Sequence, residues 1–559
     1  MRLYNVSVVI TLDVMEDLMS VPKQDSQASF FDTTFLTESL FDAQNPYTIF
    51  RRDIYPALQT MRDELCQLYC LDNGRPGIEP VLLAGVTLLQ FMEKVPDRKA
   101  VELLRLNLGW KHALNLRIDD PGFPPTSLVT FRERLTSPQN GRLLFDIILQ
   151  LVHGKGLVKR RGKQRIDSTH VLAAVARMGR LEVVRETLRL FLETVQRLHF
   201  EASLPDWSLF HDRYIDCEIA WHKVGKDQLI SKHQQAGRDM HRLLHWAGDI
   251  PELAGHEKTQ LLRRVFDEQY ELTEHGPQQR KHEGSGVVKN PHDPDVQWSS
   301  KEPNGKKAWE GYKVQIAETV PEGPSSERPK GRPTTGFITE ITTTEAIASD
   351  FAGREKVEQR QDEHGLGVAD ECYVDAGYVS DDTLARAEQA GRVLMGPARP
   401  SRNSSGDLFT ADEFEVSVAD RRAICPAGQT STQCSRLETA RTGQVNYRFE
   451  WSYHCDNCPL QSQCTKARSG RRMLVVGEHH DHLQKRRRQM QTEAFQEAMK
   501  QRNGIEGTIS EFARNGGRRT RYRGLPKTSL CNYLQGAALN IKRLIRLLQY
   551  QMSVASVSA

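Results

Sequence analysis

The stretch from Gln164 to Val175, Q-R-I-D-S-T-H-V-L-A-A-V, marks the point where the sequence changes from a helical to a strand-like pattern. Upstream, from Asp53 to about Leu151, apolar residues recur at the spacing of one helix face. Downstream lies a long helical stretch rich in Leu, Arg and Glu, from about Leu181 to Tyr270. The fold of the central part of the chain therefore depends on the strands that follow.

Four further strands are expected after this helical stretch. The segments G-Y-K-V-Q-I-A-E-T, from Gly311, and G-F-I-T-E-I-T-T-T, from Gly336, alternate and predict a hairpin with a long tip. A helix, a short strand E-C-Y-V-D that ends at Asp375, a second helix and a strand R-V-L-M-G follow. This order is that of an RNase H-like core, an α/β fold whose mixed sheet is flanked by helices. In that fold the first and fourth strands are neighbours.

These patterns divide the chain into five parts. We expect a loosely ordered arm over residues 1–45, an all-α DNA-binding domain over 46–155, the first part of the core over 160–397 with a helical insertion over 176–300, a cysteine-rich insertion over 398–480, and basic helices over 481–552 that complete the core. In the all-α domain, short capped helices with Arg132 and Arg134 on an outward face suit DNA binding. A plain helical bundle with solvated arginines fits the same residues.

Three acids occupy positions at which a metal site could form. Asp167 lies on the first strand, Asp375 at the end of the fourth, and Glu506 on a helix-like run packed over the sheet. Three carboxylates suit two Mg²⁺ or Mn²⁺ ions, which prefer oxygen ligands and together promote in-line phosphoryl transfer. Glu511 is a rival third acid, and His170 could be an outer group of this site or simply a packed residue.

The third acid belongs to a strongly basic stretch. From Arg502 to Lys527 the chain reads R-N-G-I-E-G-T-I-S-E-F-A-R-N-G-G-R-R-T-R-Y-R-G-L-P-K, and such cations suit nucleic-acid phosphates. A solvated charged face is the alternative. Trp309 and Tyr312 could stack on an unpaired base or belong to the core. The DNA contacts expected here are Arg502, Arg514, Arg518, Arg519, Arg521, Arg523 and Lys527.

The cysteines point to a second metal. The chain has 10 of them in a long sequence, which argues against a disulfide framework. Five are clustered in one short segment, and the scattered ones are Cys66, Cys70, Cys217, Cys372 and Cys531. In that segment C-P-A-G is followed by H-C-D-N-C-P-L-Q-S-Q-C, and four thiolates with one C-x-x-C pair predict a structural Zn²⁺ site. Cys434 and His454 are alternative ligands, and a set of free thiols is the alternative to a metal. The four expected ligands are Cys425, Cys455, Cys458 and Cys464.

The stretches around the acids resemble the DDE transposases of bacterial insertion sequences. The matching segments are R-I-D-S-T-H-V, D-P-D-V-Q-W-S-S-K, W-E-G-Y-K-V-Q-I, V-D-A-G-Y and the basic stretch. G-I-E-P-V-L-L-A-G-V-T-L-L-Q-F and P-D-R-K-A-V-E-L-L resemble the family's N-terminal helical domain, so the resemblance covers roughly residues 50–550. Arg502 matches the arginine of the family's Y-x-x-R-x-x-x-E signature, in which Met499 stands at the tyrosine position and Ala513 at that of the later lysine.

The resemblance implies an enzyme with Asp167, Asp375 and Glu506 as its catalytic triad and two Mg²⁺ (or Mn²⁺) ions as its cofactors. Such an enzyme binds the terminal inverted repeats of its element, cuts phosphodiester bonds at the ends and joins the 3′-hydroxyl to target DNA. Because an element has two ends, at least a homodimer is implied. An inactive or repurposed DNA-binding protein is one competing interpretation, and a nuclease without strand transfer is another.

Composition agrees with a globular protein that works away from membranes. The chain has 559 residues, of which 38% are hydrophobic and 26% charged, and a net charge of +4, so it is basic only locally. No run approaches the roughly 18 apolar residues needed to span a bilayer. The first residues, M-R-L-Y-N-V-S-V-V-I-T-L-D-V, have no small-residue cleavage site, so no signal peptide and a cytoplasmic location are expected.

Overall fold

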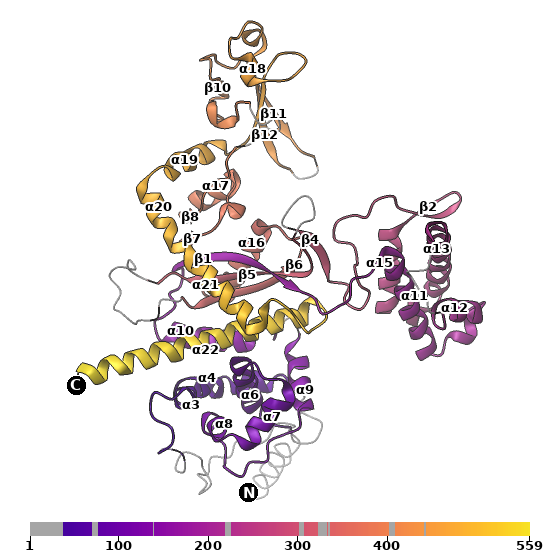
Figure 1. Cartoon of the computed structure of the whole chain (residues 1–559), viewed down its shortest axis with the longest axis vertical. Helices are drawn as coiled ribbons and strands as arrows, with labels where there is room; N and C mark the ends of the chain where they lie inside the picture. Colours follow the sequence, from indigo (N-terminus) through magenta and orange to yellow (C-terminus); the bar gives the residue numbers. More distant parts are fainter. Residues whose placement is uncertain are drawn as a thin grey trace, which may run out of the picture.

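The computed structural model describes residues 37, 39–69, 77–137, 139–217, 225–300, 307–321, 333, 336–401, 408–440 and 443–558. The protein is mixed α/β, with a central mixed sheet and many helices. Figure 1 shows helices below the sheet, a second helical group to its right and a small strand-rich unit above it. Most of the expected arm over 1–45, most of the hairpin tip and Cys70 lie outside the described residues.

The central sheet has six strands in the order β6–β5–β1–β7–β8, with β4 also paired to β5. β1 is antiparallel to β5 and parallel to β7, and β7 is parallel to β8. The prediction that the first and fourth strands are neighbours is confirmed by the β1–β7 pairing, whereas β4 is a strand that the sequence patterns do not predict. The strands are β1 (Lys163–Leu172), β4 (Gln297–Ser300), β5 (Ala308–Thr319), β6 (Ile338–Glu345), β7 (Glu371–Tyr373) and β8 (Val393–Met395).

Helices cover both faces of this sheet, because alternate strand residues point to opposite sides. On one face Ile166 and Val374 belong to the same core as side chains of α16 (Asp350–Glu363) and α17 (Asp381–Gln389). On the other face the strands share a core with α22 (Leu525–Ser558) and the N-terminal helices. Between residues 530 and 545 α22 is buried nearly all round, since it lies between the sheet and the N-terminal helices (Figure 1).

The N-terminal helices form one packed unit. Proline begins α6 at Pro80, a position at which the N–H that proline lacks would have no partner within the helix. The carboxylate of Asp97, the first residue of α7, accepts hydrogen bonds from Gln90 and Arg132. The helices are α3 (Pro46–Ile49), η1 (Phe50–Ile54), α4 (Tyr55–Thr60), α5 (Arg62–Cys66), α6 (Pro80–Glu93), α7 (Asp97–Leu106), α8 (Leu108–Ala113), α9 (Thr126–Leu135) and α10 (Leu143–Gly154).

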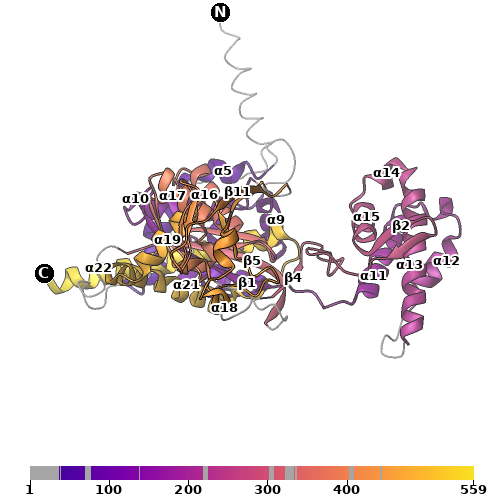
Figure 2. The ribbon, with the colours of Figure 1, turned by 90° about the horizontal axis from the view of Figure 1, so that it is seen from above.

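A helical group with its own apolar core follows β1 and stands apart from the sheet in both ribbon views (Figures 1 and 2). The chain segments that lead into and out of this group are joined by a hydrogen bond. The Asn290 side-chain amide donates to the Ala176 carbonyl at 2.9 Å. It also holds a short hairpin that the sequence patterns do not predict. The elements are α11 (Arg180–Arg197), η2 (Glu201–Ser203), α12 (Trp207–Tyr214), α13 (Lys226–Gly248), α14 (Pro251–Ala254), α15 (Glu257–Gln269), β2 (Tyr270–Thr273) and β3 (Gly276–Gln279).

The cysteine-rich segment is a small strand-rich unit around a core that includes Phe449, Trp451 and Leu474. Its elements are η6 (Ala411–Glu413), β9 (Glu415–Ser417), β10 (Arg422–Ile424), β11 (Gln433–Glu438), β12 (Val445–Glu450), η7 (Ser452–Cys455), α18 (Gln461–Cys464) and β13 (Met473–Gly477). The chain then returns to the sheet through α19 (His480–Met490), α20 (Glu493–Met499), η8 (Lys500–Asn503), α21 (Gly504–Phe512) and η9 (Ala513–Gly517). The basic helices expected over 481–552 are found as a series of short helices that leads into α22.

Candidate active site

Strand register places Asp167 and Asp375 at the same level of the sheet. The last paired residues of β1 and β7 are Arg165 and Tyr373. Asp167 comes two residues after Arg165, and Asp375 comes two residues after Tyr373. Residues two apart on a strand face the same side. Asp375 comes just after β7, at the start of the turn η5 (Ala376–Tyr378), where its Oδ1 accepts the Gly377 N–H at 2.7 Å. Two of the three predicted acids therefore share one edge of the sheet.

Arg502 joins Asp167 to the third acid. Its Nη2 donates to Asp167 Oδ2 at 2.9 Å and its Nη1 to Glu506 Oε1 at 3.3 Å. Asp167 is 15% exposed and Arg502 is 17% exposed, whereas Glu506 is 67% exposed. A guanidinium thus stands between the buried carboxylate on β1 and the open one on α21. Arg502 was expected to touch DNA, and in this structure it pairs with acids of the site.

The Asp167 carboxyl group has an unusual protonation equilibrium. Burial raises its pKa to about 6, from an ordinary value of 3.8. The neighbouring carboxylates of Asp375 and Asp350 add to the rise. The Ser168 N–H, which donates to Asp167 Oδ1 at 2.7 Å, and the Arg502 charge oppose it. Two neighbouring carboxylates therefore act on the buried Asp167 carboxyl group at this point, a pattern common at functional sites.

A buried ionic network holds α21 against the sheet. Glu318 on β5 is fully buried and accepts from Arg165 at 2.6 Å and from Arg543 of α22 at 2.9 Å. Thr508 of α21 donates to the same carboxylate, and Arg165 also donates to the Gln501 carbonyl at 2.8 Å, just before α21. These contacts fix the start of the helix that carries Glu506.

The same network separates the two candidates for the third acid. Glu511 pairs with Arg543 at 2.8 Å and with Arg546 at 3.4 Å, on the side of α21 that meets α22. Glu506 instead meets Arg502 and, through it, Asp167. Gly504 permits this placement, because a Cβ there would lie 1.9 Å from Arg165 Nη1. The geometry favours Glu506 over Glu511.

One acid beside the site was missed by the sequence patterns. Asp350 is the first residue of α16, and its Oδ1 accepts from the Ser168 hydroxyl at 3.1 Å. A Cβ on Gly377 would lie 3.0 Å from Asp350 Oδ2 and 2.9 Å from Asp375 Oδ1. We call the space at this point, which two carboxylates face, the acid-lined space. The only local signal for Asp350 was its place at a helix start, which suits any acid.

The predicted basic residues that follow α21 are exposed, and they lie on a loop that is hydrogen-bonded to the end of β1. Leu172, at the end of β1, accepts from Thr520 and donates to the Arg518 carbonyl, at 3.0 and 2.8 Å. Beyond the loop, Asp293 Oδ1 accepts the Gly524 N–H at 3.0 Å and Asp295 Oδ2 the Leu525 N–H at 2.8 Å. Within the described residues, none of these exposed side chains forms an ion pair: Arg514, Arg518, Arg519, Arg521, Arg523 and Lys527.

Two family models match this chain. The model of a transposase domain (DUF772) matches residues 36–134, and the model of a transposase DDE domain matches residues 424–545. The second match contains the helix of Glu506, the residue that Arg502 links to Asp167. Together the two matches support a DDE transposase of the insertion-sequence type. Searches of curated proteins and of solved structures gave no match.

One predicted DNA contact of the transposase is wrong. Arg132 was placed on the outward face of its helix, but it is 7% exposed and pairs with Asp97 at 2.7 Å. Its partners come from helices distant in sequence, so the local pattern gave no sign of them. Arg134 is exposed, as predicted, and its guanidinium lies 4.0 Å from the ring centre of Tyr69.

The aromatic residues near the transposase's acids belong to the core. Tyr312 is fully buried, and its hydroxyl donates to Asp293 at 2.6 Å. Trp309 is 9% exposed and packs against the His170 ring, with 5.2 Å between ring centres. Trp309 and Tyr312 therefore pack in the core in this structure rather than standing free to stack on a base. His170 packs against Trp309.

The transposase's four expected zinc ligands gather in the strand-rich unit. Burial raises the pKa of Cys464 to about 11, and the thiols of Cys425, Cys455 and Cys458 lie close enough to add to the rise. Cys434, the alternative ligand, packs against the same apolar core as Cys425, Cys455 and Cys464. Among the described residues, no three of these sulfur atoms lie within 4.8 Å of one another. The group of three possible ligand atoms that does meet this distance lies elsewhere in the chain.

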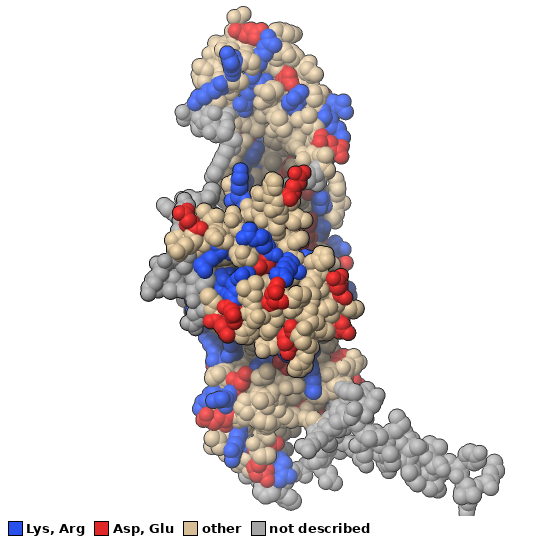
Figure 3. All heavy atoms as spheres, turned by 90° about the vertical axis from the view of Figure 1, so that its right-hand side faces the viewer, with Lys and Arg blue, Asp and Glu red and all other residues tan. Residues whose placement is uncertain are grey.

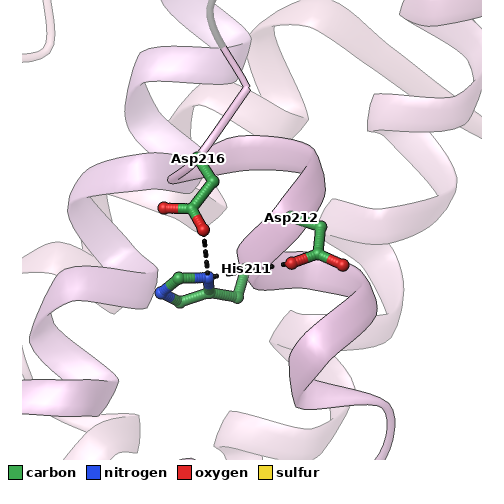
Figure 4. Close-up of side chains that lie close together, drawn as sticks. All are labelled: His211, Asp212 and Asp216. Atoms are coloured by element: carbon green, nitrogen blue, oxygen red, sulfur yellow. Dashed lines mark ion pairs between the residues drawn. The ribbon is translucent and has the colours of Figure 1, made fainter.

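That trio is His211, Asp212 and Asp216, at the end of α12 in the helical insertion (Figure 4). The His211 ring lies 3.3 Å from Asp216 and 4.0 Å from Asp212, and both acids are largely exposed. Such surface pairs are common without any ion. Of the transposase's predicted acids, by contrast, Asp167 and Glu506 both pair with Arg502.

Charge elsewhere on the transposase is mixed. On the face seen in Figure 3, Lys and Arg side chains are interspersed with Asp and Glu over most of the surface, in keeping with the net charge of +4. The unpaired cations between Arg514 and Lys527 are therefore a local feature. In the described part of the chain, helices fall short of the length and apolarity that a membrane crossing needs.

Proposed function

We propose that this transposase uses Asp167, Asp375 and Glu506 as one site for phosphoryl transfer on DNA. The observation that carries the proposal is the common level of Asp167 and Asp375 on adjacent parallel strands, with Arg502 linking Asp167 to Glu506. The strand order β6–β5–β1–β7–β8, with only β5 antiparallel to the rest, supports an RNase H-like core.

The donor set fits hard divalent cations such as Mg²⁺ or Mn²⁺. Carboxylate oxygens are their preferred ligands, Arg502 stands as a cation between two of the acids, and the acid-lined space beside Gly377 is faced by Asp375 Oδ1. Two bound ions would supply activation of the attacking oxygen and stabilisation of the leaving one. Asp167, Asp375 and Glu506 would hold them.

The chain's other residues would hold and orient DNA. The exposed cations from Arg514 to Lys527 would contact phosphates, and because their loop is bonded to the end of β1, the bound strand would pass close to Asp167. Arg134 and the N-terminal helices would contribute to recognition of the terminal repeats. Water would cut the phosphodiester at each element end, and the released 3′-hydroxyl would attack target DNA. Two ends imply at least a dimer on DNA.

The strand-rich unit would be organised by a structural Zn²⁺. Its four candidate thiolates are Cys425, Cys455, Cys458 and Cys464, and thiolate sets of this kind favour tetrahedral zinc. The backbone turn from Cys425 to Gly428, closed by a 2.8 Å hydrogen bond, presents one of these thiols. The unit lies between β8 and α19, so the metal would support the path that returns to Glu506.

The test is cleavage and joining of DNA. Duplexes that carry the inverted repeats flanking the coding sequence are incubated with the protein and Mg²⁺, and products are separated on denaturing gels. We expect nicked and joined products with wild type and with Glu497→Gln, an exposed acid of α20, but none with Asp375→Asn or Glu506→Gln. Binding without cutting in wild type would mean an inactive or repurposed protein, and cutting without joining a nuclease.

A further inference from the structure

Asp350 occupies a fixed position at the edge of the proposed active site. It begins α16, where the Ser349 hydroxyl caps the helix by accepting the Ala352 N–H at 3.1 Å. The helix approaches β5 closely, since a Cβ on Gly353 would lie 2.3 Å from Gln315 Nε2. The Asp350 carboxylate is therefore held beside the sheet by a helix packed on β5 rather than by a loop.

The two oxygens of Asp350 have different surroundings. Oδ1 accepts from the Ser168 hydroxyl and lies 3.4 Å from Lys313 Nζ. Within the described residues, no hydrogen bond or ion pair reaches Oδ2. This second oxygen and Asp375 Oδ1 lie 3.0 and 2.9 Å from the Cβ position of Gly377, at the acid-lined space. One oxygen thus anchors the side chain, and the other is available to a ligand.

The charges around this space suit a cation held against a phosphate. Asp350 and Asp375 both act electrostatically on Asp167, so the three carboxyl groups form one cluster. Arg399 Nη2 would lie 3.5 Å from the Gly377 Cβ position, and in the described part of the chain Arg399 forms no ion pair. A cation between the carboxylates would therefore have an arginine beside it that can bind an anion.

We propose that Asp350 is a fourth acid of the active site, whose Oδ2 holds a divalent cation together with Asp375. This inference rests on the proposed function, because it adds a ligand to the site described there. It also explains why residue 377 is glycine: a side chain there would fill the space that the cation needs.

The experiment measures Mn²⁺ binding by the full-length protein without DNA, by calorimetry at pH 8. All variants carry His211→Asn, which removes the surface trio of α12 as a second binding site. The variants are Asp350→Asn and Asp375→Asn, with Asp362→Asn as the matched control, since Asp362 is an exposed acid at the other end of α16. We expect Asp350→Asn to weaken Mn²⁺ binding at least tenfold and Asp362→Asn to change it less than twofold.

A second variant, Asp350→Cys, tests direct contact with the ion. A thiolate favours soft cations, so the ratio of Cd²⁺ to Mn²⁺ affinity should rise at least tenfold if residue 350 touches the cation. An unchanged ratio together with unchanged Mn²⁺ binding in Asp350→Asn would overturn the inference. Unchanged binding in Asp375→Asn would instead overturn the proposed active site itself, so the two failures are distinguishable.

Discussion

Arg502 is predicted to compete with metal for Asp167. Its guanidinium lies 2.9 Å from Asp167 Oδ2, and both side chains are less than a fifth exposed. A unit charge pair about 4 Å apart is worth about 4 kcal/mol at an effective dielectric constant of about 20. A cation that binds Asp167 must break this pair and also meets the repulsion of Arg502. We therefore expect Arg502→Gln to bind Mn²⁺ at least tenfold more tightly, which corresponds to about 1.4 kcal/mol.

Calorimetric titration with Mn²⁺ at pH 8, without DNA, measures this effect above the raised pKa of Asp167. Arg514→Gln is the matched control, because it removes the same charge from an exposed side chain and should change the affinity less than twofold. If Arg502→Gln bound Mn²⁺ as wild type does, or more weakly, Arg502 would be organising the carboxylates rather than competing for them. The reasoning would then be refuted.

Three further outcomes follow from the same contacts. Because the pKa of Asp167 is raised to about 6, protons compete with metal below that pH, so Mn²⁺ affinity should fall as pH drops from 7.5 to 5; a constant affinity would contradict this. Arg543→Met should lower the free energy of unfolding in urea by about 3 kcal/mol, whereas Arg546→Met, which removes a 56% exposed side chain, should lower it by less than about 1 kcal/mol; equal effects would count against the buried network. Metal analysis should find one zinc per chain in wild type and in Cys434→Ser but not in Cys458→Ser, and zinc retained in the last variant would exclude it as a ligand.

The central sheet could be predicted because its strands carry local signals. Alternation from Gln164 and from Gly311, and the acids at strand ends, are properties of short stretches of sequence. Short strands such as β4 and the β2–β3 hairpin carry too few residues for such a pattern. Their pairing depends on neighbours that the sequence does not place.

Features that depend on contacts between distant segments could not be predicted. Arg132 reads as outward on its own helix, yet Asp97 and Gln90 of other helices bury it. Asp350 reads as an ordinary helix start, and only the packing of α16 on β5 brings it beside Asp375. In both cases tertiary packing determines the role of the residue, which local sequence does not encode.

The central claim is that Asp167, Asp375 and Glu506 form one metal site on this sheet. Anomalous diffraction from crystals soaked in Mn²⁺ tests it most directly, since the anomalous signal locates each ion. We predict ions in contact with Asp167 and Asp375, and Arg502 turned away from Asp167. Manganese found only at His211 and Asp216, with the Arg502–Asp167 pair intact, would contradict the account.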